Sequence, residues 1–123
     1  MSLNILAVDD SRTMRDMLNM TLSMAGFTTR LAEDGKDGLE VLYRMEREPD
    51  VIITDINMPR LDGFGFIEAV RKTERHRCVP ILVLTTESAP DLKLRAREAG
   101  ATGWIVKPFD PDKLVRALQM VAG

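Results

Sequence analysis

The chain has 123 residues, the usual length of one domain, and at this length folding can bury about two-thirds of the unfolded surface. Its 17 basic and 19 acidic residues leave a net charge of −2, which excludes the strongly positive field that binding to nucleic-acid phosphates requires. A lone cysteine cannot form an internal disulfide, and no apolar run approaches the roughly 18 residues of a membrane span. We therefore expect one cytoplasmic domain over residues 1–123, without a membrane span or direct contact with nucleic acid.

Short apolar runs and helical patterns alternate along the chain from its first residues. A strand predicted at residues 5–8 precedes a helix that ends at Gly26, since glycine commonly follows the last turn of a helix. The apolar residues at helical spacing on this helix are Met14, Met17, Leu18, Leu22 and Ala25. A strand at residues 27–32 then precedes a helix with apolar residues Leu39, Val41, Leu42 and Met45.

The second half of the chain repeats this alternation. Strands are predicted at residues 50–54, 81–84 and 104–106. The continuous apolar run at residues 81–84 is typical of a strand covered on both faces. The last helix has Asp110 as its N-cap and Pro111 at its first position. The apolar stripes of the three helices are, in chain order, Phe64, Ile67 and Val70, then Leu92, Ala96 and Ala99, then Leu114, Leu118 and Val121. This alternation indicates the α/β class, with a parallel sheet and helices on both faces.

Polar side chains follow four of the predicted strands at the point where each strand ends. In chain order they are Asp9 and Asp10, Asp55, Thr85 and Thr86, and Lys107. Because open α/β sheets bind ligands at the carboxyl ends of their strands, we expect these groups to meet at one edge. A single Asp in such a place is usually a turn residue or a cap, but that interpretation leaves four matching strand ends unexplained.

Three carboxylates within about 5 Å of one another would repel by about 3 kcal/mol per pair at an effective dielectric constant near 20. We expect a cation to relieve this repulsion, and oxygen ligands with positions left for water suit Mg²⁺. Asp10 and Asp55 would be direct ligands, Asp9 would act through water, and the main-chain carbonyl of Asn57 would complete the set. A carboxylate nucleophile, a divalent ion, a hydroxyl and Lys107 together suffice for phosphoryl transfer.

Four segments at these positions resemble those of response-regulator receiver domains, in particular the stand-alone chemotaxis type called CheY. They are Val8-Asp9-Asp10-Ser11, Thr54-Asp55-Ile56-Asn57-Met58-Pro59 with Asp62-Gly63, Leu84-Thr85-Thr86-Glu87, and the sequence AGATGWIVKPF at residues 99–109. The resemblance extends over nearly the whole chain and implies one receiver domain at residues 1–123. It also implies a flavodoxin-like, doubly wound (β/α)5 fold, whose five-stranded parallel sheet has the order 2-1-3-4-5.

The resemblance implies a role for each residue at the strand ends. Asp55 would be the phospho-acceptor, supplied by a phosphohistidine on a sensor histidine kinase of the CheA kind, and would later lose the phosphoryl group to water. Asp9 and Asp10 would bind Mg²⁺, Lys107 would pair with the phosphoryl oxygens, and Thr85 would donate a hydrogen bond to one of them. The protein would thus be a signalling domain that catalyses only its own phosphoryl uptake and hydrolysis.

Three further sets of residues are candidates for controlling the domain. Asn57 and Glu87, each two residues beyond the acceptor or the threonine, match positions that tune hydrolysis. Thr85 and Trp104 would form a switch, because a hydroxyl drawn toward the phosphoryl group vacates space beside the indole; the alternative is that Trp104 only covers the edge of the core. A docking surface for an acidic output protein, such as the flagellar motor switch, is predicted on the fourth main helix at Lys93, Leu94 and Arg97. We expect the protein to be a monomer.

Alternative functions use similar groups. An aspartyl phosphatase of the haloacid-dehalogenase kind needs a second acid where this chain has Asn57, and a flavodoxin-like FMN carrier needs a phosphate loop where Asp9 and Asp10 would repel the phosphate. A phosphate sink or an intermediate in a phosphorelay remains open, because both would use the same residues as a motor-directed signal.

Three side-chain types are predicted to have only structural roles. His76 lies between Arg75 and Arg77, so we expect a solvated loop residue and assign it no function. The lone Cys78 is expected to be a small core hydrophobe. Most of the eight methionines fall at core spacing, where they would fill gaps between other apolar side chains; the alternative is a role in binding a partner.

Overall fold

The computed structural model describes residues 2–123 as one parallel sheet covered by helices on both faces. The elements are β1 (Asn4–Val8), α1 (Arg12–Met24), β2 (Thr28–Ala32), α2 (Gly35–Arg44), β3 (Val51–Thr54), α3 (Gly63–Lys72), the short 3₁₀ helix η1 (Glu74–His76), β4 (Ile81–Thr85), α4 (Pro90–Ala99), β5 (Gly103–Val106) and α5 (Pro111–Ala122). The five strands lie in the order β2-β1-β3-β4-β5, so the predicted fold class and strand order are confirmed. None of the helices within these residues is long and apolar enough to cross a membrane.

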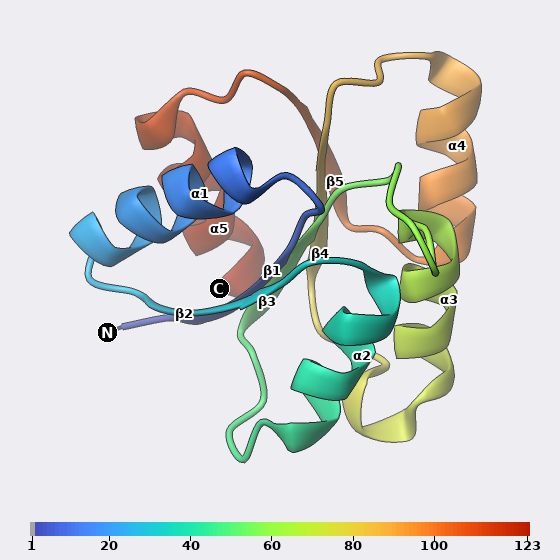
Figure 1. Cartoon of the computed structure of the whole chain (residues 1–123), viewed down its shortest axis with the longest axis horizontal. Coiled ribbons are helices and arrows are strands. Elements are labelled where there is room, and N and C mark those ends of the chain that lie inside the picture. The colour runs from blue at the N-terminus through green and yellow to red at the C-terminus, as the bar shows by residue number, and fades with distance from the viewer. Residues whose placement is uncertain (1) are drawn as a thin grey trace.

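Two hydrophobic layers enclose the sheet. Figure 1 shows α1 and α5 on one face and α2, α3 and α4 on the other. Along β1 the side chains alternate between these layers, with Leu6 and Val8 facing the larger cluster and Ile5 and Ala7 facing the smaller one. All five residues of β1 and all five of β4 are buried, which explains why these central strands have no polar alternation in the sequence.

Side-chain caps fix where the helices begin at the carboxyl edge of the sheet. Asp34, Asp62 and Asp110 each accept a hydrogen bond from a main-chain amide in the first turn of α2, α3 and α5. Ser11 caps α1 in the same way, accepting from the amide of Met14 at 3.2 Å. The predicted N-cap at Asp110 is therefore confirmed, and the loops before α1, α2, α3 and α5 each lead into a capped helix, whereas α4 begins after Ala89 without a side-chain cap.

The predictions for His76 and Cys78 were wrong. His76 is buried, with 2% of its surface exposed, and lies in η1 with its ring 6.3 Å from that of Tyr43. The flanking Arg75 turns outward and pairs with Glu48 at 2.7 Å. The charged neighbours of His76 in the sequence were therefore no evidence that its own ring is solvated. Cys78 is exposed, because the chain after η1 runs over the surface before β4 begins.

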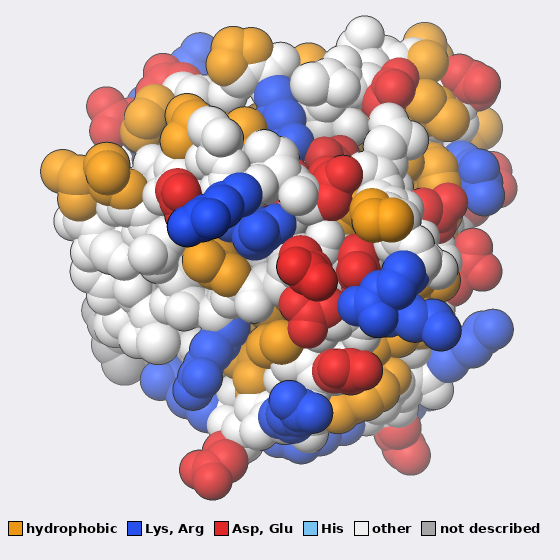
Figure 2. Space-filling view, viewed as in Figure 1, with side chains coloured by type: hydrophobic (Ala, Val, Ile, Leu, Met, Phe, Trp, Pro, Cys, Tyr) orange, Lys and Arg blue, Asp and Glu red, His pale blue; other side chains and the backbone are white. Residues whose placement is uncertain are grey.

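The prediction that most methionines belong to the core was also wrong. Among residues 2–123, only Met45 and Met58 are buried, while Met24 exposes 83% of its surface. The exposed methionines are Met17, Met20, Met24 and Met120. Figure 2 shows hydrophobic side chains gathered over the region of α1 and the start of α5. The buried stripe of α1 is accordingly narrower than its apolar pattern, and Ala25, also placed on that stripe by the sequence, is exposed.

Candidate functional site

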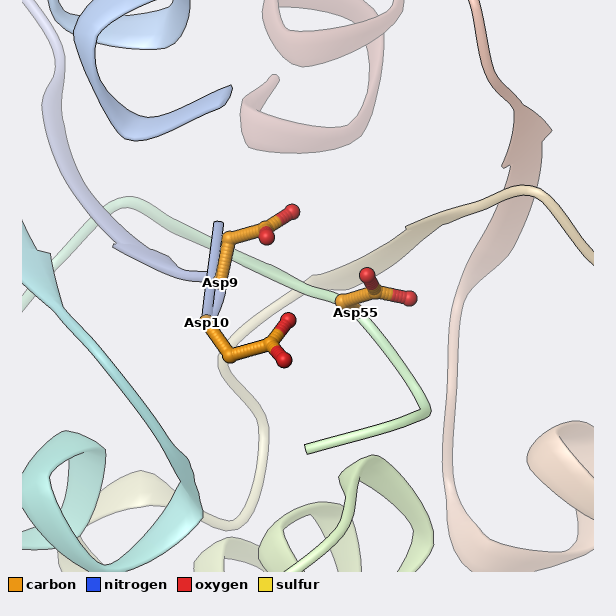
Figure 3. Close-up of side chains that lie close together, drawn as sticks. All are labelled: Asp9, Asp10 and Asp55. Carbon is orange, nitrogen blue, oxygen red and sulfur yellow. The ribbon is translucent and has the colours of Figure 1, made fainter. Parts of the chain in front are cut away.

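Three acids from two neighbouring strands meet at the carboxyl edge of the sheet. Because β1 and β3 pair in register, with Val8 opposite Thr54, the residues that follow them emerge side by side. One carboxylate oxygen from each of Asp9, Asp10 and Asp55 lies within 4.8 Å of the others, and Figure 3 shows the three side chains close together at the ends of their strands. Asp9 and Asp55 are buried, whereas Asp10 is exposed.

Lys107 joins this cluster from the end of the edge strand β5. Its Nζ donates to Oδ2 of Asp9 and to Oδ2 of Asp55, both at 2.8 Å, and only 10% of its side chain is exposed. The main-chain amide of Lys107 donates to the Thr85 carbonyl at 2.8 Å, which fixes the lysine beyond the end of β4. The ammonium therefore rests between two carboxylates, where the sequence predicted a partner for phosphoryl oxygens.

Burial and pairing compete in the ionisation of these groups. Burial raises the pKa of Asp9, and hydrogen bonds from Lys107 and Ser11 only partly offset that effect. Burial lowers the pKa of Lys107, but its hydrogen bonds to Asp55 and Asp9 outweigh burial, so the pKa is raised above its ordinary value. The raised pKa of Lys107 keeps its ammonium protonated between the two carboxylates, whereas the raised pKa of Asp9 reflects the burial of that side chain.

The donor set fits a hard divalent cation. The three acids offer only oxygen ligands, and a single ammonium among three carboxylates leaves an excess of negative charge. Within residues 2–123 the carboxylate of exposed Asp10 has no hydrogen-bond or ion-pair partner, so its oxygens are available. A cation that keeps several waters, as Mg²⁺ does, could enter from the exposed side at Asp10.

The hydroxyl, the tuning pair and the tryptophan are connected through Glu87. Its amide donates to the Thr85 hydroxyl at 3.3 Å, and its carbonyl accepts from the indole Nε1 of Trp104 at 3.0 Å. The Glu87 carboxylate accepts from the Asn57 side-chain amide at 3.2 Å. Thr86, in contrast, is exposed and is not part of this connection.

The predicted docking residues lie beside Trp104. Leu94 exposes 56% of its surface, and Lys93 and Arg97 are also exposed. Lys93, Arg97 and Trp104 line a hollow of about 230 Å³ between α4 and β5. A larger hollow of about 840 Å³ lies between α1 and α5, and it is lined by none of Asp9, Asp10 and Asp55, so size does not mark the chemical site in this protein.

Sequence reasoning missed the residues that hold the acids in place. The guanidinium of Arg15 donates to the main-chain carbonyl of Asp9 at 2.7 Å, and the amide of Ser11 donates to the Asp9 carboxylate at 2.9 Å. The amide of Ile56 donates to the Asp55 carboxylate at 2.6 Å. The position of Arg15 in the first turns of α1, one turn after the N-cap, was a signal that could have identified it.

Comparisons with known proteins agree with this geometry. The family model of the response regulator receiver domain matches residues 5–119. The chemotaxis protein CheY1 of Helicobacter pylori is 37% identical over 123 residues, covering 98% of each chain. The structure of the chemotaxis response regulator CheY4 of Vibrio cholerae is 44% identical and superposes with a TM-score of 0.91, covering 98% of this chain and 99% of that one.

A third similar protein is relevant to the acid cluster because its structure contains a magnesium ion. The receiver domain of the sensor histidine kinase PA1611 of Pseudomonas aeruginosa is 28% identical with a TM-score of 0.90, covers 100% of this chain and 99% of its own, and has a magnesium ion coordinated in its active-site cleft. Fold, strand-end residues and similarity along the chain lead to one conclusion: this chain belongs to the response regulator receiver domain family and is a CheY-like member of it.

Proposed function

We propose that this chain is a phosphorylation-controlled response regulator of a two-component system and that Asp55 is its phospho-acceptor. The observation that carries the proposal is the position of the Asp55 carboxylate, which lies beside two further acids and accepts from Lys107 at 2.8 Å. Histidine kinases such as CheA interact with CheY-like receiver domains, so we infer that a kinase of this kind is the donor. The kinase and the receiver would meet in the cytoplasm, as the sequence predicts.

The proposed transfer exchanges one bond to phosphorus for another. An Asp55 carboxylate oxygen attacks the phosphorus of a phosphohistidine, the phosphorus–nitrogen bond breaks, and the imidazole nitrogen takes a proton. The Lys107 ammonium can then turn from the Asp55 carboxylate to an oxygen of the phosphoryl group, because that group would be attached to the same Asp55 side chain. Hydrolysis transfers the phosphoryl group to water and restores the Asp55 carboxylate. We infer that Asn57 and Glu87, which are joined by a hydrogen bond, influence that step.

We propose that Mg²⁺ is held by Asp10, Asp55 and the main-chain carbonyl of Asn57, with Asp9 acting through a water. When bound, the ion would neutralise charge on the transferring phosphoryl group. The excess of negative charge around Lys107 and the free carboxylate of Asp10 support this assignment. The magnesium ion of the PA1611 receiver domain supports it by similarity.

The switch that we propose runs through Glu87. A phosphoryl oxygen would offer the Thr85 hydroxyl a charged acceptor worth about 1.5–3 kcal/mol, enough to turn the hydroxyl away from the Glu87 amide. Because the Glu87 carbonyl holds the indole of Trp104, a shift of this loop would change the Trp104 environment beside Lys93 and Arg97. An output protein that docks at Lys93, Leu94 and Arg97 would thereby sense phosphorylation, and a flagellar motor switch is the partner that we propose.

The acceptor is tested by labelling with acetyl phosphate and Mg²⁺. The wild-type protein should gain an acid-labile phosphoryl group, and Asp55→Asn should lose it because an amide is not a nucleophile of this kind. Asp112→Asn, on the exposed start of α5, is the matched control and should label normally. Unchanged labelling of Asp55→Asn would reject the assignment.

The switch is tested by the emission of Trp104, the sole tryptophan. Mg²⁺ with beryllofluoride, a phosphoryl mimic, should change its emission and its quenching by iodide, and Thr85→Ala should suppress most of that change. Thr86→Ala, at the exposed neighbouring threonine, should leave the change intact. Constant emission while beryllofluoride is bound would show that Trp104 does not report the switch.

A further inference from the structure

The loop between β3 and α3 contains a strained turn. Arg60 is the one residue other than glycine, within residues 2–123, that has a positive φ angle, at 65°. The amide of Leu61 donates to the carbonyl of Pro59 at 2.7 Å, which closes a γ-turn around Arg60. This kind of γ-turn is rare and unfavourable for a residue with a side chain, so contacts outside the turn must maintain it.

Those contacts come from the loop between β2 and α2. The Arg60 guanidinium donates to both carboxylate oxygens of Asp34, from Nε to Oδ2 at 2.8 Å and from Nη2 to Oδ1 at 3.1 Å. Asp34 is buried, and its Oδ1 also accepts from the Asp37 amide as the cap of α2. The Arg60 hydrogen bond is the main cause that lowers the pKa of Asp34 below its ordinary value.

A second contact draws the same two loops together. The amide of Gly35 donates to the carbonyl of Leu61 at 3.0 Å. A Cβ at position 35 would lie 2.9 Å from the Cβ of Leu61, so only glycine permits this approach. The turn at Arg60 is therefore attached to the β2–α2 loop both by its side chain and by the main chain that follows it.

The other end of the β3–α3 loop begins at the proposed acceptor. The amide of Ile56 donates to the Asp55 carboxylate, and the carbonyl of Ile56 accepts from the amide of Gly63 at 2.8 Å. Between these anchors lies Asn57, whose carbonyl is the proposed main-chain ligand of Mg²⁺. The conformation of Asn57 thus depends on the acceptor on one side and on the turn at Arg60 on the other.

We propose that the ion pair between Arg60 and Asp34 positions the β3–α3 loop for cation binding, by holding the turn that orients the Asn57 carbonyl. Arg60 and Asp34 are positioning residues in this proposal, which rests on the proposed function of the acids. Their effect reaches the site only through the loop, because neither residue is in the acid cluster. The same pair would be merely structural if it stabilised the fold without affecting Mg²⁺.

The test measures Mg²⁺ affinity and unfolding stability in parallel for three single variants and one double variant. Arg60→Ala removes the guanidinium and leaves the unfavourable φ angle, so we expect Mg²⁺ affinity to fall about tenfold. Arg60→Gly also removes the guanidinium but adopts a positive φ readily, so its loss should be smaller. Asp34→Asn keeps an oxygen that can cap α2 and should lose as much affinity as Arg60→Ala. The double variant Asp34→Asn with Arg60→Ala should lose little more than either single variant.

Arg75→Ala is the matched control, because Arg75 also pairs with a carboxylate at 2.7 Å on the surface, at Glu48, and contributes nothing to the acid site. It should leave Mg²⁺ affinity unchanged. Unaltered affinity in Arg60→Ala, losses that add in the double variant, or equal losses in the alanine and glycine variants would overturn the proposal. If the wild-type protein bound no Mg²⁺, both the proposed function and the positioning role of the ion pair would be rejected. If the wild-type protein bound Mg²⁺ and Asp10→Asn did not, the proposed Mg²⁺ site would stand, and the Arg60 variants alone would decide whether the ion pair positions the loop.

Discussion

The two edges of the sheet handle buried charge in opposite ways. At the carboxyl edge, Asp9, Asp10 and Asp55 share one ammonium, so negative charge is left in excess. At the amino edge, the guanidinium of Arg71 has no carboxylate partner among residues 2–123 and instead donates five hydrogen bonds to main-chain carbonyls. The acceptors belong to His76, Arg77, Val79 and Gly100. The first edge can respond to an added cation, whereas the second is already satisfied and fixes the ends of α3 and α4.

The largest expected effect is a loss of stability at the amino edge. Arg71→Ala should lower the free energy of unfolding by about 3 kcal/mol, because partly buried carbonyls lose a charged donor. Mg²⁺ affinity should not change if the edges are independent. Urea unfolding and a Mg²⁺ titration measure both quantities, with Arg77→Ala, at an exposed arginine, as the control. A weaker Mg²⁺ affinity would show that the two edges are coupled.

At the carboxyl edge, Lys107→Met should make stability depend on metal. Without the ammonium, Asp9 and Asp55 repel, and we expect the free energy of unfolding to fall by about 2 kcal/mol in EDTA. Saturating Mg²⁺ should restore most of this loss, since the ion supplies the missing charge. Lys113→Met, at an exposed lysine of α5, should show no such dependence. An equal loss with and without Mg²⁺ would mean that Lys107 contributes packing rather than charge.

Asp10→Asn should affect the metal and spare the fold. Removing one carboxylate deletes a proposed ligand and relieves repulsion, so Mg²⁺ affinity should fall about tenfold, or about 1.4 kcal/mol, without loss of stability. Isothermal titration compares the variant with Asp16→Asn, which changes an exposed acid on α1 outside the cluster. An unaltered titration would remove Asp10 from the proposed ligand set.

The smallest effect is a pH dependence at the amino edge. Burial lowers the pKa of His76, and neither ring nitrogen has a hydrogen-bond partner in the described chain, so folding favours the neutral ring. Its contribution to stability is present above the unfolded pKa near 6.5 and is lost as pH falls toward the lower folded value. As pH falls from 7 to 5, the free energy of unfolding, measured by urea unfolding, should therefore decrease by up to about 1 kcal/mol more in the wild-type protein than in His76→Phe. Parallel pH curves for the two proteins would contradict this.

The sequence predicted the fold and the meeting of the acids for a physical reason. Parallel strands must end at one edge, so residues such as Asp9 and Asp55 are brought together by topology without knowledge of any side-chain contact. The resting partner of Lys107 was not predicted, because an ammonium can reach either carboxylates or a phosphoryl group.

What the sequence did not reveal depends on how side chains turn locally. His76 was predicted to be solvated because its sequence neighbours are charged. In the structure η1 directs the His76 ring inward, and Arg75 forms an ion pair with Glu48 at the surface. The ion pair between Asp34 and Arg60 joins loops 26 residues apart, and no periodicity records such a contact.

The bridge from Lys107 joins residues that are 98 and 52 positions apart, at Asp9 and Asp55. During synthesis, both acids would emerge from the ribosome long before the ammonium that neutralises them. A nascent chain without β5 would hold the carboxylates of Asp9 and Asp55 without the Lys107 ammonium, and its sheet would lack the edge strand. The charge balance of the acid cluster is therefore completed only when the last strand has joined the sheet.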